Sequence, residues 1–302
     1  MASMPRRSRL ERSPKGIFLQ FTDLQRAIVQ RLNQYHSLPF SFFPGLVDSS
    51  PKYLGELLRK MFEEKNQFGS PLLTRDDRYG DYYGKQECYM LGVGGKKASK
   101  QLGYETVKIG NGGHLVHETM LVAAAASIEI GALAHKIIYK NAGDVFNRPE
   151  CPDETRKLIG KSKFIVKLDE KHTMAPDNIF ALGYPSHYLY FSHEVDTGTE
   201  TLTAGKSSIV KKMLDLKSFY IKQLYKRAYG LPSLITLFTT VSEARMHSMM
   251  ELAVKHQLAH ALLFNFDTRL AKKATPYKPM PELFTKPCVR PDGRTFSLLT
   301  GK

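Results

Sequence analysis

The sequence predicts an α/β (α+β) fold in two domains. Residues 17–104 show three helical patterns followed by a hairpin pattern, and residues 113–266 alternate helical and strand-like patterns, which is typical of a mixed sheet. The chain has 302 residues, 42% of them hydrophobic, which is enough for two separate cores. Residues 1–16 are predicted to be a basic flexible arm, and residues 267–302, rich in Pro and Lys, a C-terminal extension.

The charge balance favours a polyanionic partner. The chain carries 44 Lys and Arg against 29 Asp and Glu, a formal net charge of +15, and such an excess binds phosphates through charge neutralisation and counterion release. DNA is therefore the expected partner. No membrane is expected, because no stretch approaches 18 uninterrupted apolar residues and the most apolar helix carries Glu118 and Glu129.

The cysteines and the N-terminus point to the cytoplasm. The three cysteines are far apart and form no CxxC pair, so neither a zinc site nor a disulfide framework is predicted. The basic residues before Gly16 are not followed by an apolar segment and do not resemble a secretory signal. This arm either touches DNA phosphates or is a solvated tail.

Three helices are predicted in the first domain. Thr22 can cap a helix that carries Leu24, Ile28 and Leu32 on one face. A short second helix is expected near residues 41–47. A third helix begins with Ser50 as its N-cap and is the candidate recognition helix; its outward cations are Lys52, Arg59 and Lys60.

A hairpin follows the third helix. Two strand-like runs flank the sequence RDDRYGDYYGK, whose exposed tip would carry Arg75, Arg78 and Lys85. Helix, helix, helix, hairpin is the order of a winged helix, which inserts one helix into the major groove and rests its wing on the flanking backbone. Winged helices also bind proteins, but the local basic excess favours DNA.

The second domain alternates helices and strands after a connector at residues 96–113 that is rich in Gly and Lys. An Ala-rich helix at residues 114–136 is expected to pack closely against its neighbours. Two further helices are expected at residues 207–230 and 243–257. The predicted strands lie at residues 136–139, 163–169, 178–183, 188–196, 234–241 and 261–266.

Two acids are the candidate metal ligands. Asp177 begins one predicted strand, and Glu194 ends the next, after a turn that contains Gly183 and Pro185. In an antiparallel hairpin of this length both carboxylates lie at the same end, close enough to share one Mg²⁺. A metal held in this way activates water for attack on a phosphodiester. Asp177 and Glu194 are therefore predicted to be catalytic.

Nucleases with such an acid pair also place a lysine two residues after the second acid, where it stabilises the transition state. This sequence has Asp196 there. Lys217 on the following helix, or else Lys211, is predicted to supply the charge, because the position of an ammonium in space matters more than its address in the sequence. Alternatively, Asp196 and Glu200 enlarge the acidic cluster for a second cation or hold their loop.

Two further residues are candidates for a supporting role at the start of the Ala-rich helix. Glu118 can add a carboxylate to the metal site, and His117 can accept a proton near neutral pH. The alternative is a pair that caps the helix and packs. Arg245, just beyond a strand end, is expected either to grip a phosphate or to be an ordinary residue of a helix start.

Several segments in order resemble the replication-relaxation family of plasmid and mobile-element proteins. They span residues 20 to 250 and read KYLGELLRKMFEE, CYMLGVGGKKA, HLVHETMLV, APDNIFAL, FSHEVDTGTET, the stretch from Lys211 to Tyr220, and LFTTVSEAR. The resemblance implies an N-terminal winged helix-turn-helix followed by a PD-(D/E)xK restriction-endonuclease-like domain. It also implies other replication or relaxation proteins as partners. The residues marked by the resemblance are His117, Asp177, Glu194, Asp196, Thr199, Glu200 and Lys217.

Two hypotheses for the function remain open. In the first, the protein is a Mg²⁺-dependent DNA endonuclease or nickase of a plasmid, phage or mobile element. In the second, it is a non-catalytic accessory protein, or a regulator of transcription or replication, that binds DNA through an inactive nuclease-like fold. A homodimer is compatible with both hypotheses.

Overall fold

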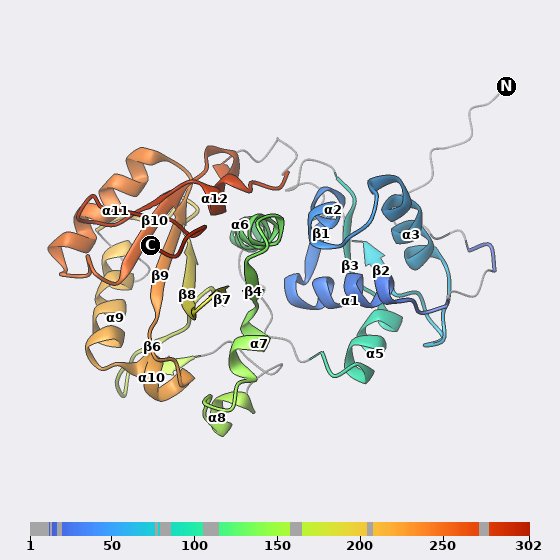
Figure 1. Ribbon diagram of the computed structural model, residues 1–302, viewed down its shortest axis with the longest axis horizontal. Helices are drawn as coiled ribbons and strands as arrows, with labels where there is room; N and C mark the ends of the chain where they lie inside the picture. Colours follow the sequence, from blue (N-terminus) through green and yellow to red (C-terminus); the bar gives the residue numbers. More distant parts are fainter. Residues whose placement is uncertain are drawn as a thin grey trace. The chain divides into compact units, whose positions relative to one another are not determined.

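The protein was analysed as a computed structural model (Figure 1). The structure describes residues 12, 14–16, 20–75, 78, 86–104, 115–157, 165–203, 208–271 and 278–302. The chain forms two compact units. The first contains Met1–Glu105 and Lys273–Tyr277, and the second contains Thr106–Lys272 and Lys278–Lys302.

The helices of the first unit begin at residues that cap them. Helix α1 (Asp23–Tyr35) starts with a capping box between Thr22 and Gln25. Strand β1 (Ser37–Pro39), the 3₁₀ turn η1 (Phe40–Phe42) and the short helix α2 (Phe43–Leu46) follow. Helix α3 (Pro51–Glu63) begins after Ser50, whose side chain accepts a hydrogen bond from the Tyr53 amide. The apolar side of α3 is buried in the core of this unit.

A three-stranded antiparallel sheet accompanies these helices. Strand β3 (Cys88–Leu91) lies between β1 and β2 (Leu73–Arg75). Helix α5 (Val93–Gln101) then covers part of the expected Gly- and Lys-rich connector, which is a difference from the prediction. Glycine is needed here for close packing, because a Cβ on Gly94 would lie 2.2 Å from the Ser70 carbonyl oxygen.

The second unit contains a mixed sheet of seven strands, which confirms the predicted α+β class. The strand order is β12-β11-β10-β9-β8-β7-β4, in which β8, β9 and β10 are parallel and the other pairings are antiparallel. The strands are β4 (Ile138–Lys140), β7 (Asn178–Tyr184), β8 (His187–Val195), β9 (Ile235–Thr240), β10 (Leu262–Phe266), β11 (Cys288–Val289) and β12 (Thr295–Phe296). A separate ribbon pairs β5 (Val166–Lys167) with β6 (Thr173–Met174).

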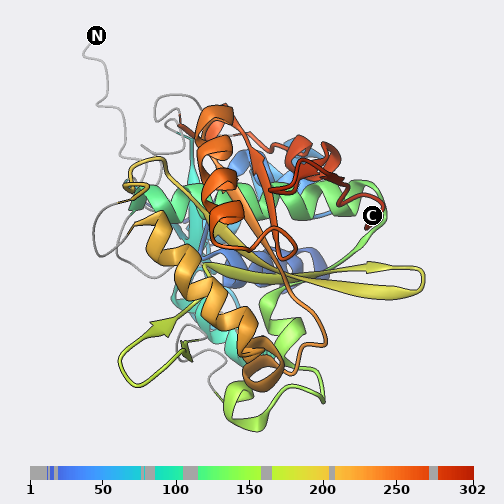
Figure 2. The ribbon, with the colours of Figure 1, turned by 90° about the vertical axis from the view of Figure 1, so that its left-hand side faces the viewer.

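Helices cover both faces of this sheet (Figures 1 and 2). Helices α9 (Ile209–Ile221) and α11 (Glu243–Lys255) lie on one face, where Met213 and Met249 pack in one core cluster with Phe238 of β9. Helix α6 (Leu115–Ala134) lies on the other face and contacts β8. The shorter helices are α7 (Ala142–Phe146), α8 (Asp153–Arg156), α10 (Leu224–Tyr229), η2 (Thr268–Ala271) and α12 (Glu282–Thr285).

Helix α6 is a core helix. It is long and apolar enough to cross a membrane, but 83% of its apolar window is buried inside the protein. Gly131 allows α12 to approach it closely, because a Cβ at this position would lie 2.5 Å from the Cβ of Phe284. The Ser127 hydroxyl accepts a hydrogen bond from the Met280 amide and donates one to the Ala123 carbonyl. These contacts anchor residues beyond 278 on the second unit.

The expected C-terminal extension therefore belongs to the second unit. Val289 of β11 pairs with Phe264 of β10, and β12 pairs with β11. Cys288, Phe296 and Leu298 are buried. Strands of two residues show no periodicity, so no pattern in this segment predicts that it extends the sheet.

Candidate functional site

The two predicted metal ligands lie at the same end of the β7–β8 hairpin. Asn178 pairs with His193, so continuing the register places Asp177 opposite Glu194. Directly opposed residues of an antiparallel pair point to the same face, here the face covered by α9. The Val195 amide donates a hydrogen bond of 3.1 Å to Asp177 Oδ2, which joins the two strand ends. The predicted convergence of Asp177 and Glu194 is present.

His117, from the first turn of α6, lies beside Asp177. Its Nε2 atom is 3.2 Å from Asp177 Oδ2 and 3.1 Å from the Val195 carbonyl oxygen. Both of these oxygens are acceptors, so we infer that Nε2 carries the proton and donates to them. His117 thus orients the Asp177 carboxylate. Glu118, the next residue of α6, is buried.

The lysine at this site is Lys212. Its Nζ atom lies 2.6 Å from Glu194 Oε2 and 3.9 Å from Asp177 Oδ2. Lys211 is instead exposed and pairs with Asp215, and Lys217, more than a turn further along α9, donates a hydrogen bond to Gln257 just after α11. The structure therefore does not bring the predicted Lys217 or Lys211 to the acids.

Helical phase explains this difference. Successive residues of an α-helix are rotated by about 100°, so only one of two neighbouring lysines can face the sheet. Ile209, Met213, Leu216 and Phe219 are the fully buried positions of α9, and Lys212 lies on their side of the helix. The spacing of the apolar residues 209, 213, 216 and 219 was visible in the sequence, and it is the signal that favours Lys212 over Lys211 and Lys217.

The carboxyl groups at this site have opposite pKa shifts. Burial raises the pKa of Glu194 to about 7, although Lys212 opposes the shift. Burial also acts to raise the pKa of Asp177, but the charge of Lys212 and the hydrogen bond from His117 outweigh it and hold that pKa well below its usual range. Burial acts to lower the pKa values of Lys212 and His117, yet the neighbouring carboxylates raise both.

Asp196 is engaged elsewhere. Its side chain is only 2% exposed and accepts two hydrogen bonds, of 2.9 and 3.0 Å, from Arg245 and one from the Thr240 hydroxyl. Arg245 also donates to the Glu200 carbonyl. Of the alternatives for Asp196, the loop-holding one agrees with this geometry. Arg245 is committed to the same contacts and is not available to grip a phosphate.

The donor set suits a hard cation. The carboxylates of Asp177 and Glu194 and the carbonyl of Val195 provide oxygen ligands only, which Mg²⁺ prefers. Within the described ranges, no group of three His, Cys, Asp or Glu side chains could hold a metal. Mg²⁺ commonly binds through one or two carboxylates and completes its shell with water and substrate phosphate. The oxygen donors of the two acids are therefore the feature of this site that fits such an ion.

The predicted DNA-binding residues of the first unit differ in exposure. Lys52, Arg59 and Lys60 are exposed on α3, and Arg78 is also exposed. Lys85 lies outside the described residues. The side chain of Arg75 is only 11% exposed and pairs with Glu87.

Two aromatic rings hold the guanidinium of Arg75. Its central carbon lies 4.3 Å from the ring centre of Phe62 and 4.9 Å from that of Tyr89. The prediction that Arg75 lies at an exposed tip is therefore wrong. An arginine packed between two rings stabilises the fold through cation–π contacts.

No family model, curated protein or solved structure matches this chain.

Proposed function

We propose that the protein is a Mg²⁺-dependent DNA endonuclease that nicks DNA at the carboxyl end of β8. The observation that carries this proposal is the convergence of Asp177, Glu194 and Lys212, from three separate elements, around one point at the sheet edge. A pair of acids with an ammonium beside them is the minimal set for metal-assisted hydrolysis of a phosphodiester.

Each residue of the site has a role in this proposal. Asp177, Glu194 and the Val195 carbonyl would hold Mg²⁺, which when bound supplies an activated water and stabilises charge on phosphorus. Lys212 contributes positive charge beside the scissile phosphate. His117 donates to Asp177 and keeps its carboxylate oriented. Arg245 and Asp196 tie the loop after β8 to the end of β9 and so position the start of α9.

The first unit supplies DNA binding in this proposal. The order α1, β1, α2, α3, β2, β3, with β3 between β1 and β2, agrees with a winged helix. The cations exposed on α3 are the proposed contacts to DNA. The resemblance to the replication-relaxation family supports the same assignment, together with a role in processing plasmid or mobile-element DNA in the cytoplasm.

Nicking of a supercoiled plasmid tests the proposal. The purified full-length protein is expected to convert supercoiled plasmid to the open circle with Mg²⁺ and not with EDTA. Asp177→Asn and Lys212→Met are expected to lower the rate at least 100-fold. Asp153→Asn and Lys211→Met are the matched controls, because both residues are exposed and lie outside the site. A wild-type rate equal to that of Asp177→Asn would refute the proposal.

A second function is favoured by one observation. Lys212 already compensates Glu194, whose side chain is only 3% exposed, so the site is stable as an ion pair without a metal. Such a protein would be a non-catalytic DNA-binding regulator. It predicts that Glu194→Gln leaves DNA affinity and its steep salt dependence unchanged, with no nicking by the wild type.

A further inference from the structure

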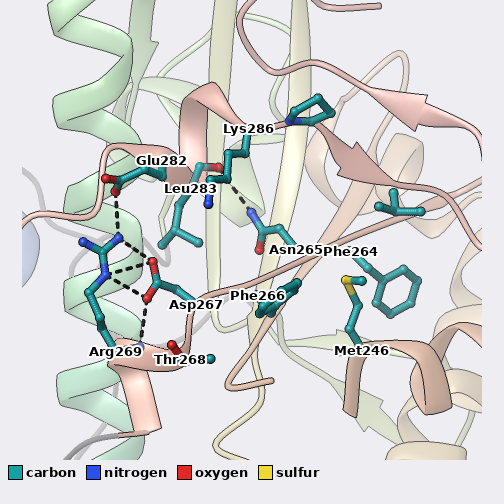
Figure 3. A pocket seen from close by; sticks show the side chains of 12 residues that line it. Met246, Phe264, Asn265, Phe266, Asp267, Thr268, Arg269, Glu282, Leu283 and Lys286 are labelled. Atoms are coloured by element: carbon teal, nitrogen blue, oxygen red, sulfur yellow. Dashed lines mark hydrogen bonds and ion pairs between the residues drawn. The ribbon is translucent and has the colours of Figure 1, made fainter. Parts of the chain in front are cut away.

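A cavity opens at the same edge of the sheet as the candidate site. Its volume is about 460 Å³, within the range of roughly 300–1,000 Å³ that is usual for ligand pockets. It lies at the end of β10, between the start of α11 and α12 (Figure 3). None of the roles proposed above uses it.

The sheet register relates this cavity to the acids. Strands β8, β9 and β10 are parallel, so their carboxyl ends meet at one edge, where ligands of open α/β sheets bind. Glu194 is level with Phe238, which is level with Phe264. Phe266, two residues further along β10, therefore points to the same face as Glu194. Two strand spacings separate β8 from β10 by about 10 Å.

The wall of the cavity is apolar at the strand end. Phe266 is partly exposed there, and Met246 and Leu283 also line the space (Figure 3). An accessible aromatic ring at the edge of a basic protein is a platform on which a nucleobase can stack, with little dependence on sequence.

The rim of the cavity is polar and contains one uncommitted cation. Arg269 is held by Asp267 at 2.6 Å and by Glu282 at 2.7 Å, so its charge is already compensated. Lys286 is exposed, and its ammonium makes no hydrogen bond or ion pair within the part of the chain that the structure describes. An ammonium without an ion-pair partner, in the lining of a cavity that also contains an aromatic ring, suits a phosphate that adjoins a stacked base.

We propose that this cavity receives one unpaired nucleobase of the strand that is bound at the candidate site. The base stacks on Phe266, and Lys286 binds a neighbouring phosphate. The distance of about 10 Å from β8 corresponds to about three stacked nucleotides at 3.4 Å each. The inference rests on the proposed function, because that function lays a nucleic-acid strand along this edge. It adds a preference for DNA in which bases near the scissile phosphate are unpaired.

A tryptophan reporter tests the stacking directly. The chain contains no tryptophan, so Phe266→Trp creates a single fluorophore in the cavity. A single-stranded DNA decamer in EDTA is expected to quench its emission at least twofold. Tyr188→Trp is the matched control, because Tyr188 is exposed near the turn of the β7–β8 hairpin, at the other end of β8. It is expected to show no quenching.

An abasic decamer with the same phosphates separates base stacking from charge. It is expected to bind without quenching the emission of Phe266→Trp. Equal quenching by both decamers, or no quenching by either, overturns the proposal. Lys286→Gln, an exposed substitution that leaves the core intact, is expected to weaken decamer binding 3- to 10-fold relative to Lys167→Gln. Equal affinities of these two variants also overturn it.

The endonuclease proposal and the base-pocket proposal can each be refuted without the other. Because the fluorescence assay contains EDTA, it does not require cleavage. Quenching at residue 266 in a protein that nicks no plasmid would refute the endonuclease and leave the base pocket supported. Nicking that depends on Asp177, without quenching at residue 266, would refute the pocket alone.

Discussion

Lys212→Met removes the only lysine that contacts the two acids in the described part of the second unit. Its ammonium is 2.6 Å from Glu194 Oε2, and the Glu194 side chain is only 3% exposed. Removing one partner of a buried ion pair costs about 3–5 kcal/mol, because the other charge is left uncompensated. Glu194 can avoid this penalty by taking up a proton, so we expect the cost of the substitution to depend on pH.

The sign follows from the raised pKa of Glu194. A carboxyl group whose pKa is raised on folding stabilises the fold most below its unfolded pKa, and that contribution is lost as the pH rises towards the folded pKa. In Lys212→Met the folded pKa rises beyond about 7, its value with the lysine present. Each pH unit above the unfolded value of 4.5 then costs about 1.4 kcal/mol. The wild type bears the same cost only up to its own Glu194 pKa of about 7, so through this titration the variant is expected to differ little from it at pH 5.5 and to lose about 1.4 kcal/mol more at pH 8.

Urea denaturation followed by circular dichroism at these two pH values measures the difference. Lys211→Met is the matched control: it removes an exposed lysine one residue away and is expected to change the unfolding free energy by less than about 0.5 kcal/mol at either pH. An equal loss of stability at pH 5.5 and pH 8 would show that Glu194 does not titrate in response to Lys212, and the electrostatic account of this site would be wrong.

Two further predictions concern stability. Arg245→Met is expected to destabilise the second unit by about 3 kcal/mol, because the buried Asp196 carboxylate loses its ion-pair partner. The Asp196 pKa is lowered in the fold, so this loss of stability should shrink as the pH falls below 3.8. A loss that does not depend on pH would contradict the ion-pair account. Gly131→Ala is expected to cost about 1–3 kcal/mol in thermal denaturation, because its Cβ would overlap Phe284. The counterpart is Gly55→Ala inside α3, where the added Cβ would lie 3.7 Å from its nearest neighbour, a ring atom of Phe40. This variant should be more stable than the wild type by about 0.5–1 kcal/mol. Changes in stability of the same sign for both variants would refute the packing argument.

Local patterns in the sequence were enough to predict much of the second unit. The strand-like runs NIFALG and YLYFSHEVD and the turn that contains Gly183 and Pro185 predicted the β7–β8 hairpin, and the register of a hairpin follows from its turn. That register alone places Asp177 opposite Glu194. The side chains that complete the site come from two helices that are distant in sequence. His117 of α6 lies 60 residues before Asp177, and Lys212 lies on α9, which begins after residue 208. Their approach depends on packing against the sheet and not on local sequence.

Other features depended on contacts that no local pattern reveals. Arg75 stands in a polar, Gly- and Asp-rich segment and was predicted to be an exposed wing residue. It is instead packed between Phe62 and Tyr89, which lie 13 residues before it and 14 residues after it. The C-terminal residues had the composition of a surface tail, yet they pair with β10.

The sequence by itself determined the α+β class, the helix starts at Thr22 and Ser50, and the hairpin that carries the two acids, because capping and short-range periodicity act within a few residues. Only the tertiary structure decided which lysine meets those acids and what Asp196 binds. The rotation of α9 about its axis is set by the burial of Met213 and Leu216, and the partners of Asp196 come from β9 and α11. Both depend on long-range burial of apolar surface.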